Sequence, residues 1–127
     1  MSETITGNGW AVGNVDGMGE GPGFRKVRRE LDVTEFGVNA IVVPPAYTTR
    51  VHYHERQQEL YFVHSGELEF IFGQGDDEER HVLGPGGIAR VDAATVRGLR
   101  NTSETEEAVY LCVGAEGGYV GRDGQVA

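Results

Sequence analysis

The sequence is poor in several residue types that would point to particular protein classes. Its 127 residues include one cysteine and four prolines, and basic residues are outnumbered, with 11 Lys and Arg against 20 Asp and Glu. The single Cys112 excludes an intrachain disulfide, and its apolar run AVYLCVGA favours a small buried core residue over a nucleophile. The net charge of −9 argues against nucleic acid or an anionic membrane as the main partner.

Long apolar runs and targeting signals are also missing. No stretch approaches the length needed to span a bilayer, and the N-terminus MSETITGNG lacks the basic start and apolar run of a signal peptide. We therefore expect a cytoplasmic protein.

Glycine, by contrast, is abundant. There are 20 glycines, roughly twice the usual share of about 7%. Turn signals recur roughly every 8 to 12 residues, and the segments between them are rich in aromatic and β-branched residues. No window sustains the i, i+3, i+4 apolar spacing of a helix. The pattern predicts an all-β sandwich or barrel without helices.

The chain divides into three parts. Residues 1–23 hold seven glycines and are predicted to form a flexible arm with one short strand near GWAV. Residues 24–115 are the predicted β-barrel, and residues 116–127 a glycine-rich tail. The basic cluster in FRKVRREL is interpreted as the solvated side of a strand, in preference to a phosphate-binding patch. Within the barrel, ELYFVHSGELEFIFG is predicted to form two strands that bend at Ser65–Gly66.

The stretch RVHYHERQQELYFVHSGELEF carries the clearest chemical signal. His52 and His54 are one residue apart, so in a strand both point to the same face. Glu59 has the wrong parity for an unbroken strand, so a bulge or turn within ERQQ is needed to bring it to that face. Two imidazoles and a carboxylate form a facial triad that suits Fe(II), and also Zn, Mn, Ni or Co.

These residues resemble the first motif of the cupin family. In that motif H-x-H is followed after three or four residues by glutamate, and after six more by glycine; His52, His54, Glu59 and Gly66 match every position. The resemblance extends less tightly from Phe36 to Val113. It implies a small single-domain antiparallel jelly-roll, or double-stranded β-helix, with a metal inside the barrel and frequent homodimerisation.

The second cupin motif departs from the family at its metal ligand. Gly86 and Asn101 fit the pattern, but Asp92 replaces proline, Ala94 replaces glycine and Arg97 replaces the histidine ligand. A sub-branch of small bacterial and archaeal cupins resembles this chain in carrying arginine there. Arg97 shares a strand face with the apolar Leu99, so we expect its side chain to point inward.

Several roles for Arg97 remain open. Arginine is not a metal ligand, and a guanidinium about 5 Å from a site of net charge about +1 would be repelled by roughly 3 kcal/mol at an effective dielectric of about 20. An anionic substrate that bridges the metal and Arg97 would reverse that effect. Without metal, Arg97 could pair with Glu59 and leave a relic site.

The sequence supports two classes of function. One is a metal-dependent oxygenase, isomerase or lyase in which Arg97 clamps a small anionic molecule and Tyr61 donates a hydrogen bond. The other is non-catalytic: a module that binds a small anion through Arg97, with or without metal, or a structural protein with a relic site. His64 has the opposite strand parity and is interpreted as a surface or dimer-contact residue, and His81 as a solvated hairpin residue.

Overall fold

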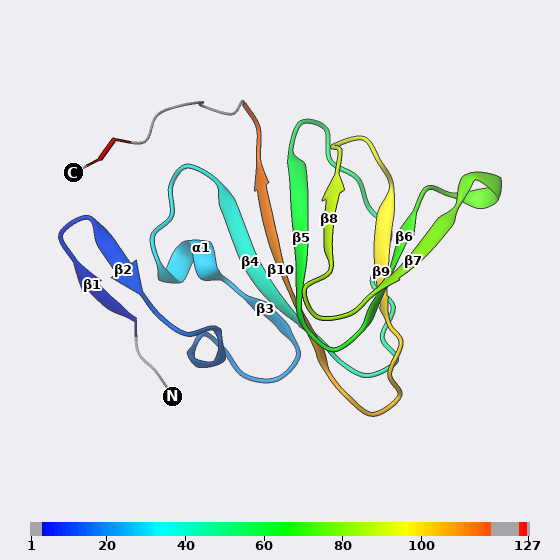
Figure 1. Cartoon of the computed structure of the whole chain (residues 1–127), viewed down its shortest axis with the longest axis horizontal. Helices are drawn as coiled ribbons and strands as arrows, with labels where there is room; N and C mark the ends of the chain where they lie inside the picture. Colours follow the sequence, from blue (N-terminus) through cyan, green and yellow to red (C-terminus); the bar gives the residue numbers. More distant parts are fainter. Residues whose placement is uncertain (1–3, 118–124, 127) are drawn as a thin grey trace.

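The computed structural model describes residues 4–117 and 125–126, and it is almost entirely β (Figure 1). A five-stranded sheet has the order β3-β4-β10-β5-β8, and a three-stranded sheet has the order β7-β6-β9. All pairings in both sheets are antiparallel. The predicted all-β jelly-roll class is therefore confirmed. The strands are β3 (Gly23–Arg25), β4 (Gly37–Val43), β5 (Gln58–Ser65), β6 (Leu68–Phe72), β7 (Glu79–Leu83), β8 (Ile88–Val91), β9 (Arg97–Asn101) and β10 (Ala108–Ala115).

The inner faces of the two sheets form the core. In β5 the burial alternates, with Tyr61 and Val63 buried and Phe62 exposed between them, as the strand period requires. Tyr61 packs edge-on against Phe70 of the facing sheet, with ring centroids 5.7 Å apart. The buried cluster consists of Ile41, Val43, Tyr61, Val63, Leu68, Phe70, Val91, Leu99, Ala108 and Tyr110.

The expectation of no helix is wrong for one short segment. Val27–Glu30 forms a single helical turn, α1, where a strand was predicted. The reason is tertiary packing: Val27 and Leu31, four residues apart, both pack on the outer face of β4 against Val38 and Ala40. One turn is too short to show as a sustained helical period in the sequence.

The N-terminal segment contains the strand predicted near GWAV. Trp10–Val12 (β2) pairs with Ile5–Gly7 (β1) as a separate hairpin, drawn beside α1 in Figure 1. Single turns of 3-10 helix lie at Val15–Gly17 and Gly75–Asp77. The proposed boundaries of arm, barrel and tail stay predictions, and most of the predicted tail, residues 118–124 and 127, lies outside the described residues. No helix in the described part of the chain is long and apolar enough to cross a membrane.

Gly66 makes the turn between β5 and β6, as predicted from the sequence. Its φ is +77°, and a Cβ added there would lie 2.7 Å from the Cβ of Ala108 and 2.9 Å from the carbonyl oxygen of Glu107. The Gly66→Ala variant should therefore lose about 2–4 kcal/mol of unfolding free energy, from left-handed strain together with overpacking. Urea unfolding measures the loss.

Gly84→Ala is the matched control, because a Cβ there meets nothing within 4 Å and its φ is not positive. We expect this change to stay below about 1 kcal/mol. Similar losses in both variants would contradict a specific role for Gly66.

Candidate metal centre

Both candidate histidines lie on an extended segment that runs beside β9. The His52 amide donates to the Arg97 carbonyl, and the Arg97 amide donates to the His52 carbonyl, both at 2.9 Å. This segment forms isolated bridges, Thr48 with Arg100 and His52 with Arg97, so it is not the regular strand assumed from the sequence. Between the bridges, one segment has three residues, 49–51, and the other has two, 98–99. The extra residue makes a bulge.

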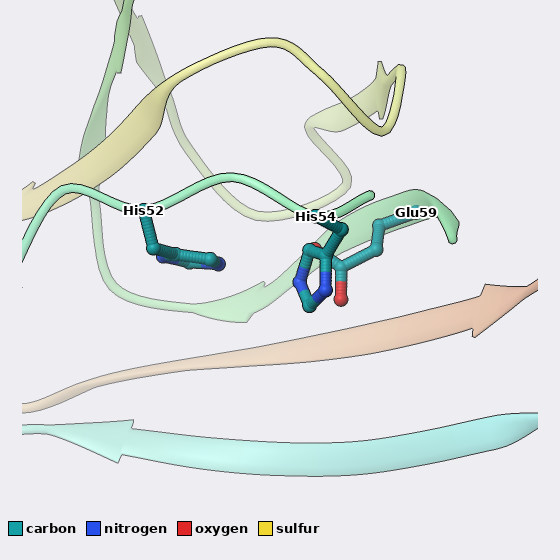
Figure 2. A group of neighbouring side chains, drawn as sticks. All are labelled: His52, His54 and Glu59. Atoms are coloured by element: carbon teal, nitrogen blue, oxygen red, sulfur yellow. The ribbon is translucent and has the colours of Figure 1, made fainter. Parts of the chain in front are cut away.

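The three predicted metal ligands converge (Figure 2). One ligand atom from each of His52, His54 and Glu59 lies within 4.8 Å of the other two. His54 Nε2 is 3.4 Å from Glu59 Oε1, and the two imidazole centroids are 5.2 Å apart. A bend at residues 55–56 lets β5 begin at Gln58 and turns Glu59 toward the histidines, as predicted from ERQQ.

This donor set fits a divalent transition metal. Donors bound at about 2.0–2.2 Å to one ion lie roughly 3–4 Å apart, so small side-chain rotations would bring all three into coordination. Glu59 is buried at 8% exposure, whereas His52 is exposed, which leaves one side of the cluster open to water or a ligand. Burial and the charge of Arg97 lower the pKa of His52, and the neutral imidazole is the form that binds metal.

The carboxylate of Glu59 is densely hydrogen-bonded. Its Oε1 accepts from the Tyr61 hydroxyl at 2.8 Å and from Arg97 Nη2 at 2.5 Å. Its Oε2 accepts at longer range, from Cys112 Sγ at 3.3 Å and Gln57 Nε2 at 3.4 Å. Burial alone would raise the pKa of Glu59, but the hydrogen bonds from Arg97 and Tyr61 outweigh it and hold that pKa below its usual range. Oε2 is therefore the oxygen with the weaker protein contacts.

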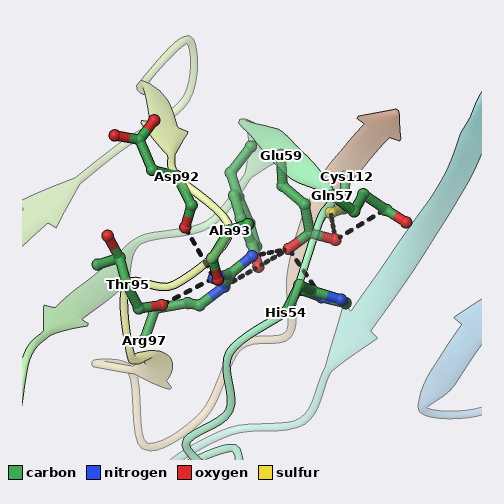
Figure 3. A network of polar contacts seen from close by, with 9 residues as sticks. His54, Gln57, Glu59, Asp92, Ala93, Thr95, Arg97 and Cys112 are labelled. Carbon is green, nitrogen blue, oxygen red and sulfur yellow. Dashed lines mark hydrogen bonds and ion pairs between the residues drawn. The ribbon is translucent and has the colours of Figure 1, made fainter. Parts of the chain in front are cut away.

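Arg97 points inward, as predicted, and is only 1% exposed (Figure 3). Its Nη1 donates to three backbone carbonyls, those of Asp92 at 3.2 Å, Ala93 at 3.1 Å and Thr95 at 2.7 Å. Its Nε lies 3.4 Å from the Tyr61 hydroxyl oxygen, which accepts the hydrogen bond. Burial alone would lower the pKa of Arg97, but the ion pair with Glu59 raises it above its usual value, so the group stays charged.

Two residues that touch Glu59 were not assigned to the site from the sequence. Cys112 was predicted to be a core residue, yet it is half-buried and its thiol donates to Glu59. Burial, followed by the charge of Glu59, raises the pKa of Cys112 to about 12, so the thiol remains protonated. Gln57 lies in the ERQQ break, and its amide donates to Glu59 Oε2 at 3.4 Å.

A cavity of about 500 Å³ adjoins the cluster through His52. Its walls are mainly apolar, and Arg50 and Thr49 add polar groups next to His52. Within residues 4–117 and 125–126, Arg50 forms no ion pair, unlike Arg97. The apolar walls comprise Pro22, Phe24, Ile41, Val42, Val43, Pro44, Tyr47, Leu99 and Tyr110.

Comparison with known proteins gives one family and many structures of the same fold. A family model described as the cupin domain matches residues 40–114. A cupin protein from Bacteroides fragilis is 21% identical, with a TM-score of 0.70 over 86% of this chain and 92% of its own. An uncharacterised protein with a double-stranded β-helix domain from Klebsiella pneumoniae is 25% identical, with a TM-score of 0.68 over 84% and 90% of the two chains.

A third structure carries an activity in its description. It is a sugar phosphate isomerase of the cupin superfamily from Silicibacter pomeroyi, 26% identical, with a TM-score of 0.64 over 74% of this chain and 59% of its own. A search of the curated proteins found no match.

Proposed function

The chain belongs to the cupin family, and on that premise we propose that it binds a divalent transition metal and acts on a small anionic molecule. His52, His54 and Glu59 would hold the ion. The observation that carries the proposal is their convergence within 4.8 Å, beside a cavity whose lining includes His52. A bound ion would supply Lewis-acid polarisation of the substrate, as in isomerase, lyase or oxygenase chemistry.

Two features support an anionic substrate. The similar protein from Silicibacter pomeroyi is described as acting on a sugar phosphate, which is anionic. The cavity beside His52 also presents Arg50, a cation with no ion-pair partner among the described residues. A site of net positive charge, formed by a divalent ion, one carboxylate and Arg50, favours a negatively charged ligand.

Arg97 and Tyr61 have a role in this proposal that differs from direct substrate contact. Both donate to Oε1 of Glu59, and Arg97 is further tied to three backbone carbonyls. A direct clamp on the ligand would require Arg97 to leave these partners. We therefore propose that Arg97 and Tyr61 are positioning residues, which fix the carboxylate with Oε1 beside His54, 3.4 Å from its Nε2.

Arg50→Gln tests which arginine contacts the anion. Carboxylates and sugar phosphates would first be screened by thermal shift with and without Zn²⁺ or Mn²⁺, and the best stabilising ligand titrated by calorimetry. Loss of one charged hydrogen bond, worth about 1.5–3 kcal/mol, should weaken that ligand roughly 10- to 150-fold and leave metal affinity unchanged.

Arg56→Gln is the control, because Arg56 lies in the same loop and is exposed like Arg50, but it does not line the cavity and is paired with Glu116. Its ligand affinity should match that of the unchanged protein. If Arg50→Gln binds the ligand as tightly as Arg56→Gln, Arg50 does not recognise the anion.

The second candidate function is a metal-free binding module. The 2.5 Å contact between Arg97 and Glu59 favours it, because the carboxylate is satisfied without an ion. The two functions differ in a simple way. A module binds its ligand equally well after chelator treatment and does not convert it, whereas the enzyme needs metal for both.

The homodimer predicted from the sequence stays a prediction. A surface suited to a dimer contact lies on the outer face of β5 and β8, where Leu60, Phe62 and Ile88 are exposed, at 42%, 39% and 59%. Phe62 lies opposite Ile88 in the register, so the three side chains form one apolar patch. Sedimentation velocity gives the oligomeric state directly.

A further inference from the structure

We propose that the outer face of the five-stranded sheet carries a second anion-binding site, built around Arg25, that takes a small carboxylate with an apolar body. This site is separate from the metal centre. Arg25 lies opposite Ala40 in the pairing of β3 with β4, so both side chains lie on the outer face, where both line one cavity of about 630 Å³. Ile41 and Val43, on the inner face of the same strand, belong to the barrel core.

Arg25 is a buried cation without an acidic partner. It is only 7% exposed, and among the described residues its side chain donates one hydrogen bond, from Nη2 to the carbonyl of Gly21 at 2.6 Å. No carboxylate of residues 4–117 and 125–126 forms an ion pair with it. Buried charges are rarely left unpaired, because desolvation of an isolated ion is strongly unfavourable. The open partner position of Arg25 therefore points to an anion.

The loop before β3 holds this guanidinium in place. A Cβ added at Gly19 would lie 3.0 Å from Arg25 Cδ and 3.2 Å from its Nη1, so the backbone of the loop lies directly against the side chain. With Gly21 accepting its hydrogen bond, Arg25 is fixed on two sides. A guanidinium fixed in this way loses little conformational freedom when it binds a carboxylate.

The other walls of the cavity define the rest of the ligand. Phe62, Val109 and Leu111 supply apolar surface, and His64 supplies a polar group. Asp16 and Glu107 also line the cavity, and their negative charges would repel a dianion such as phosphate. They can accept hydrogen bonds from a hydroxyl or an amine. The lining therefore suits a monocarboxylate that carries an apolar group and one such donor.

Phenyllactate is a suitable probe because it combines a carboxylate, a hydroxyl and an aromatic ring. We would titrate it into the full chain at fixed ionic strength and follow the backbone amides by NMR. Saturable shifts are expected at Gly21, Arg25, Ala40 and Leu111. The methyl ester of phenyllactate, which lacks the negative charge, should bind at least about 10-fold more weakly. Inorganic phosphate should bind more weakly than phenyllactate.

Arg25→Gln should weaken phenyllactate at least about 10-fold, while Arg25→Lys, which keeps the charge, should lose less. Arg29→Gln is the matched control: it removes the same charge from an exposed position of α1 and should leave the affinity unchanged. His54→Ala should also bind phenyllactate at full strength, which separates this site from the metal centre. Absence of saturable shifts, equal binding of the ester, or equal affinity in Arg25→Gln and Arg29→Gln would each overturn the proposal.

Discussion

The Arg97→Met variant is expected to lose about 3–5 kcal/mol of unfolding free energy when no metal is present. Arg97 is 1% exposed and pairs with Glu59, which is 8% exposed. Without the guanidinium, the Glu59 carboxylate is left buried with Tyr61 as its nearest remaining donor, and three backbone carbonyls lose a hydrogen bond. Urea unfolding of chelator-treated protein gives the value.

Arg100→Met is the matched control for this prediction. Arg100 lies on the same strand and also pairs with a glutamate, at 3.0 Å from Glu69, but it is 40% exposed. The Arg100→Met variant should lose about 1 kcal/mol of unfolding free energy or less, because exposed ion pairs contribute little to stability. Adding Glu59→Gln to Arg97→Met should restore part of the stability by removing the unpaired charge. Equal losses for the two arginine variants would contradict the buried ion pair.

His54→Ala is expected to lower the affinity for Zn²⁺ or Co²⁺ by more than about 100-fold. Loss of a group that only supports a ligand already weakens metal sites roughly 10- to 100-fold, so loss of the ligand itself should exceed that. Competition titration against a chromophoric chelator measures the affinity. The variant should fold normally, because the His54 side chain is 34% exposed and lies outside the buried apolar core.

His64→Ala tests whether any histidine would give the same result. His64 is exposed on the outer face of β5, as its parity in the sequence indicates. Its removal should leave the metal affinity of the barrel unchanged. If both variants bind metal like the unchanged protein, the three-ligand centre does not exist.

Most of the fold could be predicted from the sequence because its signals are local. Glycine-bearing turns such as Ser65–Gly66 and the two-residue alternation of ELYFV specify strands and their buried faces without any knowledge of partners. The helical turn at Val27–Glu30 could not be predicted, since it depends on packing against Val38 and Ala40 in a later strand.

The parts of the candidate site that depend on strand parity and residue spacing could be predicted from the sequence. The contacts that depend on the register between strands could not. The convergence of His52, His54 and Glu59 and the inward direction of Arg97 follow from parity and one break in the chain. The contact of Cys112 with Glu59 depends on how β10 aligns with β5, which a single sequence does not contain.

Arg50 was overlooked for a different reason. Its parity with His52 is visible in the sequence, but a bulge at residues 49–51 and the cavity beside it were needed to show that the cation has an open space to face. Arg25 was overlooked likewise: in the sequence it is one of four basic residues within 25–29, and only the structure shows that β3 and the glycine loop bury it.

Metal stoichiometry of the purified protein tests directly whether His52, His54 and Glu59 form a metal centre. Elemental analysis after purification without chelators or affinity metals, followed by titration of the apo protein with Co²⁺, reports both the resident ion and the capacity of the site. We expect one divalent ion per chain, and uptake of Co²⁺ that fails in His54→Ala and persists in His64→Ala. Metal below one tenth of an equivalent, with no uptake on titration, would contradict the metal centre. The Arg97–Glu59 ion pair would then occupy the interior of the barrel without a metal ion.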